Sequence, residues 1–167
     1  MVSLEVVAIL LSGISISASL LYYANVLQNA NKTRQAQLFM NLYGTYHSPE
    51  FRKKWHDLTQ RKWTDIEDWR RKYTQSSEDL AAYTSMLSFF NGIGVLLHRK
   101  LIDIDMVDDL LSVNIRGFWS QYQSTVYHTR EVIGEPKLYY YTEYLYEEIM
   151  KKHNKLPDLG KLEYREA

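Results

Sequence analysis

Residues 6–27, VVAILLSGISISASLLYYANVL, decide the architecture of this chain because they contain no charged side chain. About 22 residues that rise about 1.5 Å each form a helix about 33 Å long, close to the thickness of the hydrocarbon core of a bilayer. The sequence therefore predicts one transmembrane helix, with residues 1–27 as a membrane anchor and the lipid bilayer as a partner.

A cleaved signal peptide is the alternative to a retained anchor. Signal peptides have a basic segment, then about 7–15 apolar residues, then a small-residue cleavage site. Here no Lys or Arg precedes the apolar run, the run is longer, and no good cleavage site follows it. These differences favour a retained anchor.

The charges that flank the apolar run predict its orientation. Glu5 lies on the N-terminal side, whereas Lys32 and Arg34 lie on the C-terminal side and the basic run 52–54 follows. Basic residues are enriched on the cytoplasmic side of membrane helices. We therefore expect a single-pass protein of the cell membrane with its N-terminus outside and its C-terminal domain in the cytoplasm.

Composition excludes several classes of protein. The chain has 167 residues, and its 20 Lys and Arg balance its 20 Asp and Glu. A nucleic-acid-binding protein would show a clear basic excess, so nucleic acid is not an expected partner. The chain has no cysteine, which excludes disulfides, thiolate catalysis and zinc sites built from cysteine.

No segment after the anchor alternates as a strand does, and several segments have helical periodicity, so the predicted fold class is all-α. The anchor helix is expected to continue through residues 28–47 as a membrane-proximal extension. Residues 48–153 would form one compact multi-helix domain, and residues 154–167 a loose C-terminal tail.

Capping residues predict where the helices of this domain begin. Ser48-Pro49-Glu50 predicts a start, because it offers a capping hydroxyl and a proline in the first turn. Thr64-Asp65-Ile66-Glu67 has a capping-box pattern before a helix through Tyr73. Ser77-Glu78-Asp79 would open the longest soluble helix, with an apolar stripe that comprises Leu80, Tyr83, Met86, Leu87, Phe90, Ile93, Gly94 and Leu97.

Three further helices are expected after that stripe. Asp103 or Asp105 would cap a short helix through Leu111, and residues 114–133 would form a separate one. Gly134 is typical of a helix stop, and the last helix would run from about Lys137 to His153.

No pattern of catalytic or metal-binding residues is present. No Glu-x-x-His pair, His-Glu-x-x-His motif or Gly-x-Ser-x-Gly motif occurs. Gly92-Ile93-Gly94 lies in a helical pattern and predicts close helix packing rather than a dinucleotide loop. The acidic cluster 103–109 is interpreted as a cap and a solvated turn. We therefore predict no catalytic residue, no metal ion and no cofactor.

Small residues predict a contact inside the membrane, because they let helices approach closely in lipid and their hydroxyls can bond across. The partner would be another transmembrane helix or a second copy of the chain. The alternative is that each serine bonds only to the backbone of its own helix. The predicted contact residues are Ala8, Ser12, Gly13, Ser15, Ser17 and Ser19.

A basic segment near the membrane allows two interpretations. Residues 28–62 contain seven basic and two acidic side chains, and Arg52, Lys53 and Lys54 are adjacent. Such a run can attract an anionic leaflet. A solvated helix face explains it equally well.

Four packing motifs carry a resemblance to a known family. They are Ser48-Pro49-Glu50-Phe51 with Trp55, the run FFNGIG at 89–94, Trp119 followed by Arg130, and the run YTEYLY at 141–146. On these the chain resembles an uncharacterised family of bacterial and archaeal proteins with one N-terminal span and a helical cytoplasmic domain of unknown function. The resemblance implies no activity, so no residue inherits a catalytic role.

Two functional hypotheses follow. The first is a non-catalytic interaction or scaffold module, an accessory subunit of a larger membrane assembly. The second is a membrane-tethered enzyme or ligand sensor with a pocket lined by Asn91, Trp119, Arg130 and Tyr141. These four residues would otherwise form a polar network in the core.

Overall fold

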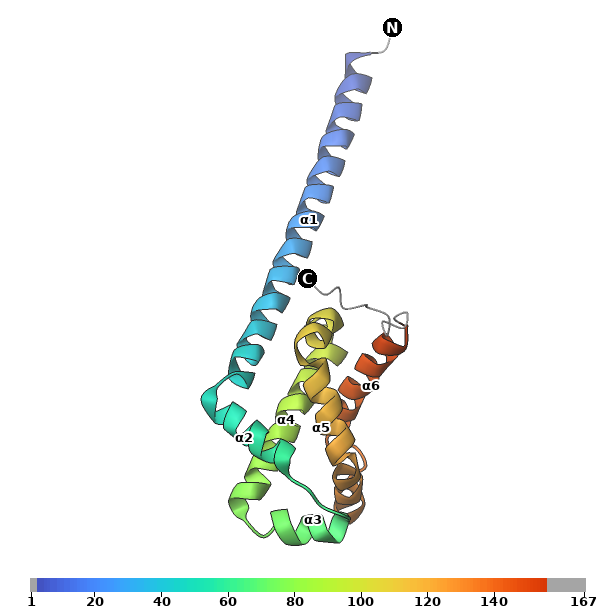
Figure 1. The fold of residues 1–167 in the computed structure, drawn as a ribbon. Coiled ribbons are helices and arrows are strands. Elements are labelled where there is room, and N and C mark those ends of the chain that lie inside the picture. The colour runs from blue at the N-terminus through green and yellow to red at the C-terminus, as the bar shows by residue number, and fades with distance from the viewer. Residues whose placement is uncertain (1–2, 156–167) are drawn as a thin grey trace, which may run out of the picture. The chain divides into compact units, whose positions relative to one another are not determined.

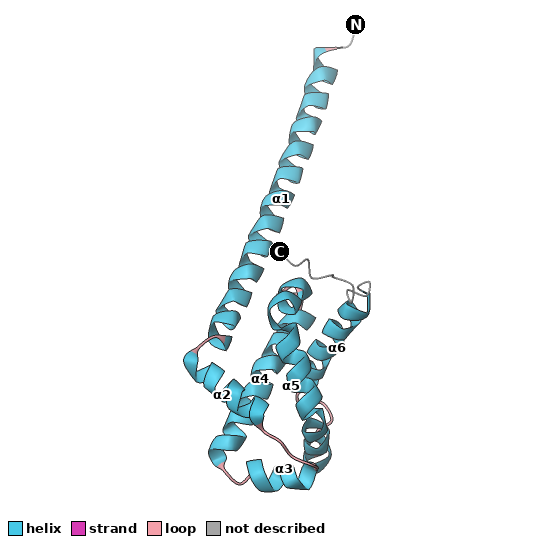
Figure 2. Cartoon of the chain, viewed as in Figure 1, coloured by secondary structure: helices cyan, strands magenta, loops and turns pink. Residues whose placement is uncertain are grey.

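The computed structural model describes residues 3–155, and all regular structure in that range is α-helical (Figures 1 and 2). This confirms the predicted all-α fold class. The described chain forms two compact units that divide after Met40, and each is considered by itself. The helices are α1 (Leu4–Tyr46), α2 (Pro49–Gln60), α3 (Ile66–Tyr73), α4 (Ser77–His98), α5 (Ile104–Ile133) and α6 (Tyr140–Lys155).

The first unit contains α1 as far as Met40, and the N-terminal part of this helix is apolar. Ile9 is 70% exposed and Leu20 is 65% exposed, and none of the most apolar 18-residue window of the helix is buried. A helix that is apolar on all sides is normally covered by protein or by lipid. By length and composition, α1 is therefore a candidate membrane span.

The second unit begins at Asn41, and its described part, residues 41–155, is called the helical unit. Helix α4 has the length and composition of a membrane span too, but 44% of its most apolar window is buried in the helical unit. This burial identifies α4 as a core helix. Its predicted stripe is buried from Tyr83 to Leu97, whereas Leu80 at the start of the helix is 39% exposed.

Gly94 brings α4 close to α6, as the sequence predicts. A β-carbon at this position would lie 2.7 Å from the carbonyl carbon of Tyr141 and would also meet its oxygen. Such overlap with the backbone of α6 leaves no room for any side chain. Gly92 has no neighbour within 4 Å of the equivalent point, so only one of the two glycines is required by packing.

Helix α2 begins as predicted. Pro49 occupies the first turn, and the amide of Phe51 donates a 3.3 Å hydrogen bond to the Ser48 hydroxyl. The hydroxyl thus satisfies one of the amides that have no partner within the helix.

Replacing Ser48 with alanine is expected to lower the free energy of unfolding by about 1 kcal/mol, since the Phe51 amide would lose its partner. Urea titration of the full chain in detergent, followed by tryptophan fluorescence, measures this change. Ser48→Asp should retain the wild-type value, because a carboxylate accepts the same hydrogen bond.

The start of α3 differs from the prediction by one residue. Asp65, not Thr64, is the cap, and its carboxylate accepts a 2.9 Å hydrogen bond from the amide of Asp68. Asp68 in turn accepts from the amide of Thr64 at 3.2 Å. Asp is a stronger capping residue than Thr, so the two hydrogen bonds of the cap form around Asp65.

The two helices predicted between Asp103 and Ile133 are one helix. Helix α5 has 30 residues, so it is longer than α4, which has 22 and was expected to be the longest soluble helix. Asp103 is the cap, and Gly134 ends the helix with φ of 73°, as predicted. The helix is continuous because one buried stripe crosses the expected break: Val107, Leu111, Ile115, Phe118, Trp119, Tyr122 and Val126.

Helix α6 begins at Tyr140 rather than at about Lys137. Residues 136–139 form turns, and Tyr139 has a left-handed φ of 52°. A residue in this conformation cannot belong to a right-handed helix, so α6 starts only after it. The helix continues to Lys155, past the expected start of a tail at residue 154; the rest of that predicted tail lies outside the described residues.

Candidate functional site

The serines of α1 bond within their own helix. The hydroxyls of Ser12, Ser15, Ser17 and Ser19 each donate to the carbonyl four residues earlier, at 2.8–2.9 Å. These hydroxyls therefore need no second helix to satisfy them. Only the small size of these residues then favours a neighbouring helix.

Gly13 and Ser17 do not continue the line of Ala8, Ser12, Ser15 and Ser19. They border a shallow hollow together with Ile9, Ile14, Ala18 and Leu21. Positions 9, 13, 17 and 21 lie along one face of the helix at a spacing of four residues. On this face the small residues Gly13 and Ser17 are flanked by the larger Ile9 and Leu21.

The predicted membrane-surface residues are exposed on α2. Arg52 donates a 3.1 Å hydrogen bond to the Tyr46 hydroxyl, and its guanidinium lies 5.4 Å from the centre of the Tyr46 ring. Lys53 and Lys54 line an open charged cleft of about 620 Å³ between α2 and α4. Contact of these three residues with lipid stays a prediction.

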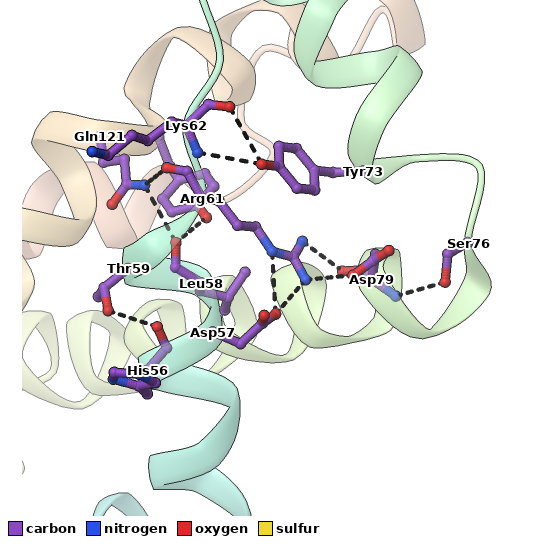
Figure 3. Close-up of polar contacts among 11 residues, drawn as sticks. His56, Asp57, Leu58, Thr59, Arg61, Lys62, Tyr73, Ser76, Asp79 and Gln121 are labelled. Carbon is purple, nitrogen blue, oxygen red and sulfur yellow. Dashed lines mark hydrogen bonds and ion pairs between the residues drawn. The ribbon is translucent and has the colours of Figure 1, made fainter.

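Arg61 lies at this cleft and ties α2 to α4. Its side chain is only 4% exposed and forms ion pairs with Asp57 at 2.7 Å and with Asp79 at 2.6 Å (Figure 3). Its guanidinium also lies 4.8 Å from the centre of the Tyr73 ring. The planar group thus joins two carboxylates and an aromatic face, which suits Arg better than Lys.

Other side chains close the end of α2 beside Arg61. The Gln121 amide donates to the carbonyls of Leu58 and Arg61, at 3.3 and 2.9 Å (Figure 3). The Tyr122 hydroxyl donates to the same Leu58 carbonyl at 2.8 Å, and burial raises the pKa of this tyrosine. These bonds satisfy carbonyls that have no partner within the helix, so the arrangement is structural.

Sequence reasoning missed this cluster. The spacing of Asp57 and Arg61, four residues apart on a helix, was the one local signal. Asp79 and Gln121 are 18 and 60 residues from Arg61, and only the fold brings them to it.

Of the four residues of the predicted pocket, Asn91 and Tyr141 are in contact, whereas Trp119 and Arg130 each contact Tyr127. The Tyr141 amide donates to the Asn91 side-chain oxygen at 3.1 Å, so Asn91 satisfies an amide at the start of α6. Trp119 is 2% exposed, and its ring lies 5.9 Å from that of Tyr127. The Arg130 guanidinium also lies near Tyr127, at 5.3 Å from the centre of its ring.

Arg130 and Tyr127 share the carboxylate of Glu143. The guanidinium donates to it at 2.7 Å and the phenol at 2.6 Å, and Arg130 also donates to the Leu138 carbonyl at 2.9 Å. The hydrogen bond to Glu143 raises the pKa of Tyr127 to about 12. The contacts join α5 to α6, which is the arrangement expected of a polar network that supports packing.

A second hollow in the helical unit is mainly apolar. It is an open groove of about 420 Å³ between α3, α4 and α5, and it was not predicted. Two of its residues carry nitrogens that are inaccessible to water and that have no hydrogen-bond partner among residues 3–155: Trp69 Nε1 and His128 Nε2. Its lining comprises Trp69, Arg70, Thr74, Leu80, Tyr83, Thr84, His128, Thr129, Val132, Ile133, Leu138 and Tyr139.

The acidic cluster 103–109 forms ion pairs with α6. Asp108 is 8% exposed and meets His153 at 2.6 Å and Lys152 at 3.0 Å. Burial raises the pKa of Asp108, but the hydrogen bonds from His153 and Lys152 outweigh it and hold the pKa below its usual value. Within the described range, no group of three or more His, Asp or Glu side chains is placed to hold a metal ion.

Acidification is expected to remove the contribution of Asp108 to stability. Because its pKa is lower in the folded than in the unfolded state, that contribution is complete above about pH 5 and is lost as the pH falls through the folded value. The difference in unfolding free energy between wild type and Asp108→Asn should therefore shrink below about pH 4. The matched control is Asp109→Asn, an exposed neighbour whose change should have little effect at any pH.

The comparisons with known proteins identify a family but no relative of known activity. No curated protein and no solved structure matches this chain. The family match extends from the apolar part of α1 through most of α6, over residues 5–149. The chain therefore belongs to the family DUF4760, a domain of unknown function.

Proposed function

We propose that this chain is a single-pass protein of the cell membrane whose helical unit acts as a non-catalytic interaction or scaffold module. Residues 1–27 would be the anchor, residues 28–47 its extension, and residues 48–153 a cytoplasmic domain. The observation that carries the proposal is the apolar surface of α1, which has no buried residue in its most apolar window. Lipid is the environment in which such a surface is stable.

Membrane extraction tests the anchor. The full chain should stay in the membrane pellet after alkaline carbonate treatment and should keep its N-terminal residues by intact-mass measurement. Release into the aqueous phase, or loss of the apolar segment, would show that it is a processed signal sequence instead.

Thiol labelling tests the orientation, because the chain has no cysteine of its own. Ser3→Cys should react with a membrane-impermeant maleimide on intact cells, and Val113→Cys only after lysis. Val113 is 70% exposed, so its reagent access depends on the membrane rather than on the fold. Labelling of Val113→Cys on intact cells would reverse the proposed orientation.

The proposed assembly would use the small residues of α1, either with a partner helix or with a second copy. Crosslinking in native membranes should trap a species larger than the monomer. Ser15→Leu should reduce the amount of this species, because the larger side chain would keep the helices apart. Ile16→Leu keeps the side-chain volume and serves as the control. A strict monomer with no co-purifying protein contradicts the proposal.

A further inference from the structure

The groove between α3, α4 and α5 has the size and lining of a small-molecule site. Its volume is about 420 Å³. Pockets of about 300–1,000 Å³ with mainly apolar walls and a few polar groups are typical of ligand sites. Two of its wall residues, Val132 and Ile133, are 69% and 62% exposed, so the apolar surface extends to the rim.

Two unpaired nitrogens distinguish this groove from ordinary apolar surface. Trp69 is 4% exposed. Its Nε1 and the Nε2 of His128 are buried and have no hydrogen-bond partner within residues 3–155. An indole nitrogen can only donate, and a buried donor without an acceptor is unfavourable. Rotation of either ring toward the groove would meet an acceptor on a bound ligand, and such side-chain rotations commonly accompany binding.

The charge of the lining favours an anion. Among residues 3–155, Arg70 and His128 are the only ionisable side chains of the lining apart from two tyrosines, and no Asp or Glu of that range lines the groove. Arg70 has a contact with Glu67 at 3.2 Å, but both side chains are more than half exposed. Such a pair is weak and leaves the guanidinium available to a second anion.

We infer that this groove binds a small apolar monocarboxylate, with the hydrocarbon or aryl body against the apolar wall and the carboxylate toward Trp69, His128 and Arg70. A carboxylate offers two acceptor oxygens and bonds strongly to charged and neutral N–H donors. This inference does not depend on the proposed membrane anchor, because every lining residue belongs to the helical unit.

The test uses the full chain in lipid nanodiscs and the probe 4-(4-fluorophenyl)butanoate, observed by its ¹⁹F resonance. The probe should bind saturably above the level of empty nanodiscs. The neutral amide of the same acid should bind about tenfold more weakly, since it lacks the charge.

Two pairs of variants locate the site. Val132→Glu places a like charge at the rim and should weaken binding at least about tenfold, whereas Val113→Glu, on the same helix and 70% exposed, should leave it unchanged. Trp69→Phe removes the N–H and keeps an aromatic ring, so it should weaken binding about tenfold. Trp119→Phe, which is equally buried but outside the groove, is its control.

Near-UV circular dichroism verifies that each variant is folded. The inference is overturned if the probe does not bind saturably. This result is also expected if a lipid chain or another protein occupies the groove. Equal binding by Val132→Glu and Val113→Glu also overturns it, because the probe would then bind elsewhere. Equal binding of acid and amide overturns the assignment of a carboxylate.

Discussion

Gly94→Ala is expected to lower the free energy of unfolding of the helical unit by about 3 kcal/mol, at the upper end of the cost of overpacking a core. The added β-carbon would overlap the carbonyl group of Tyr141, with 2.7 Å to its carbon. This neighbour is backbone in the first turn of α6, so no side-chain rotation relieves the overlap. Helix α6 must move away from α4 as a whole.

Urea titration in detergent measures this change through tryptophan fluorescence, because all four tryptophans lie between residues 55 and 119. The matched control is Gly92→Ala, two residues earlier on the same helix and with open space around it. That change should stabilise the unit by about 0.5–1 kcal/mol, since alanine favours the helix. Equal effects of the two substitutions would contradict the close approach of α4 and α6.

Arg61→Ala is expected to cost about 2–3 kcal/mol, since it removes two charge-assisted contacts and the stacking on Tyr73. The cost is not larger because Asp57 and Asp79 keep side-chain exposures of 62% and 36%, so water can still reach both carboxylates. Arg61→Lys should recover only part of the loss, because a single ammonium cannot reproduce the planar fork.

The control for Arg61 is Arg70→Ala, which breaks an exposed pair with Glu67. Exposed pairs contribute little, so the expected change is below about 0.5 kcal/mol. The same urea titration compares the variants. A loss at Arg61 no larger than that at Arg70 would show that the buried guanidinium does not hold α2 to α4.

Features that depend on neighbouring residues were predictable. The cap at Ser48, the stop at Gly134 and the buried stripe of α4 follow from local chemistry and helical period. The close approach at Gly94 was also predictable, because a glycine on an apolar stripe has few other uses. The start of α6 was not, since it depends on the left-handed conformation of Tyr139.

The candidate sites depend on residues far apart in the chain, and sequence alone did not find them. The sequence offered Asn91, Arg130 and Tyr141 as members of a pocket or a polar core. The bond from the Tyr141 amide to Asn91 and the ion pair of Arg130 with Glu143 could not be read from spacing. The apolar groove combines three helices and a turn, and its unpaired nitrogens are visible only when every neighbour is placed.

Helix α6 covers Gly94 and the apolar stripe of α4, and this has a consequence for biosynthesis. Because α6 is the last described helix to leave the ribosome, the nascent chain presents α4 without its main packing partner. During that interval two of the described helices, α1 and α4, have the length and composition of a membrane span. Packing against α6 therefore covers apolar surface of α4 that would otherwise be stable in lipid.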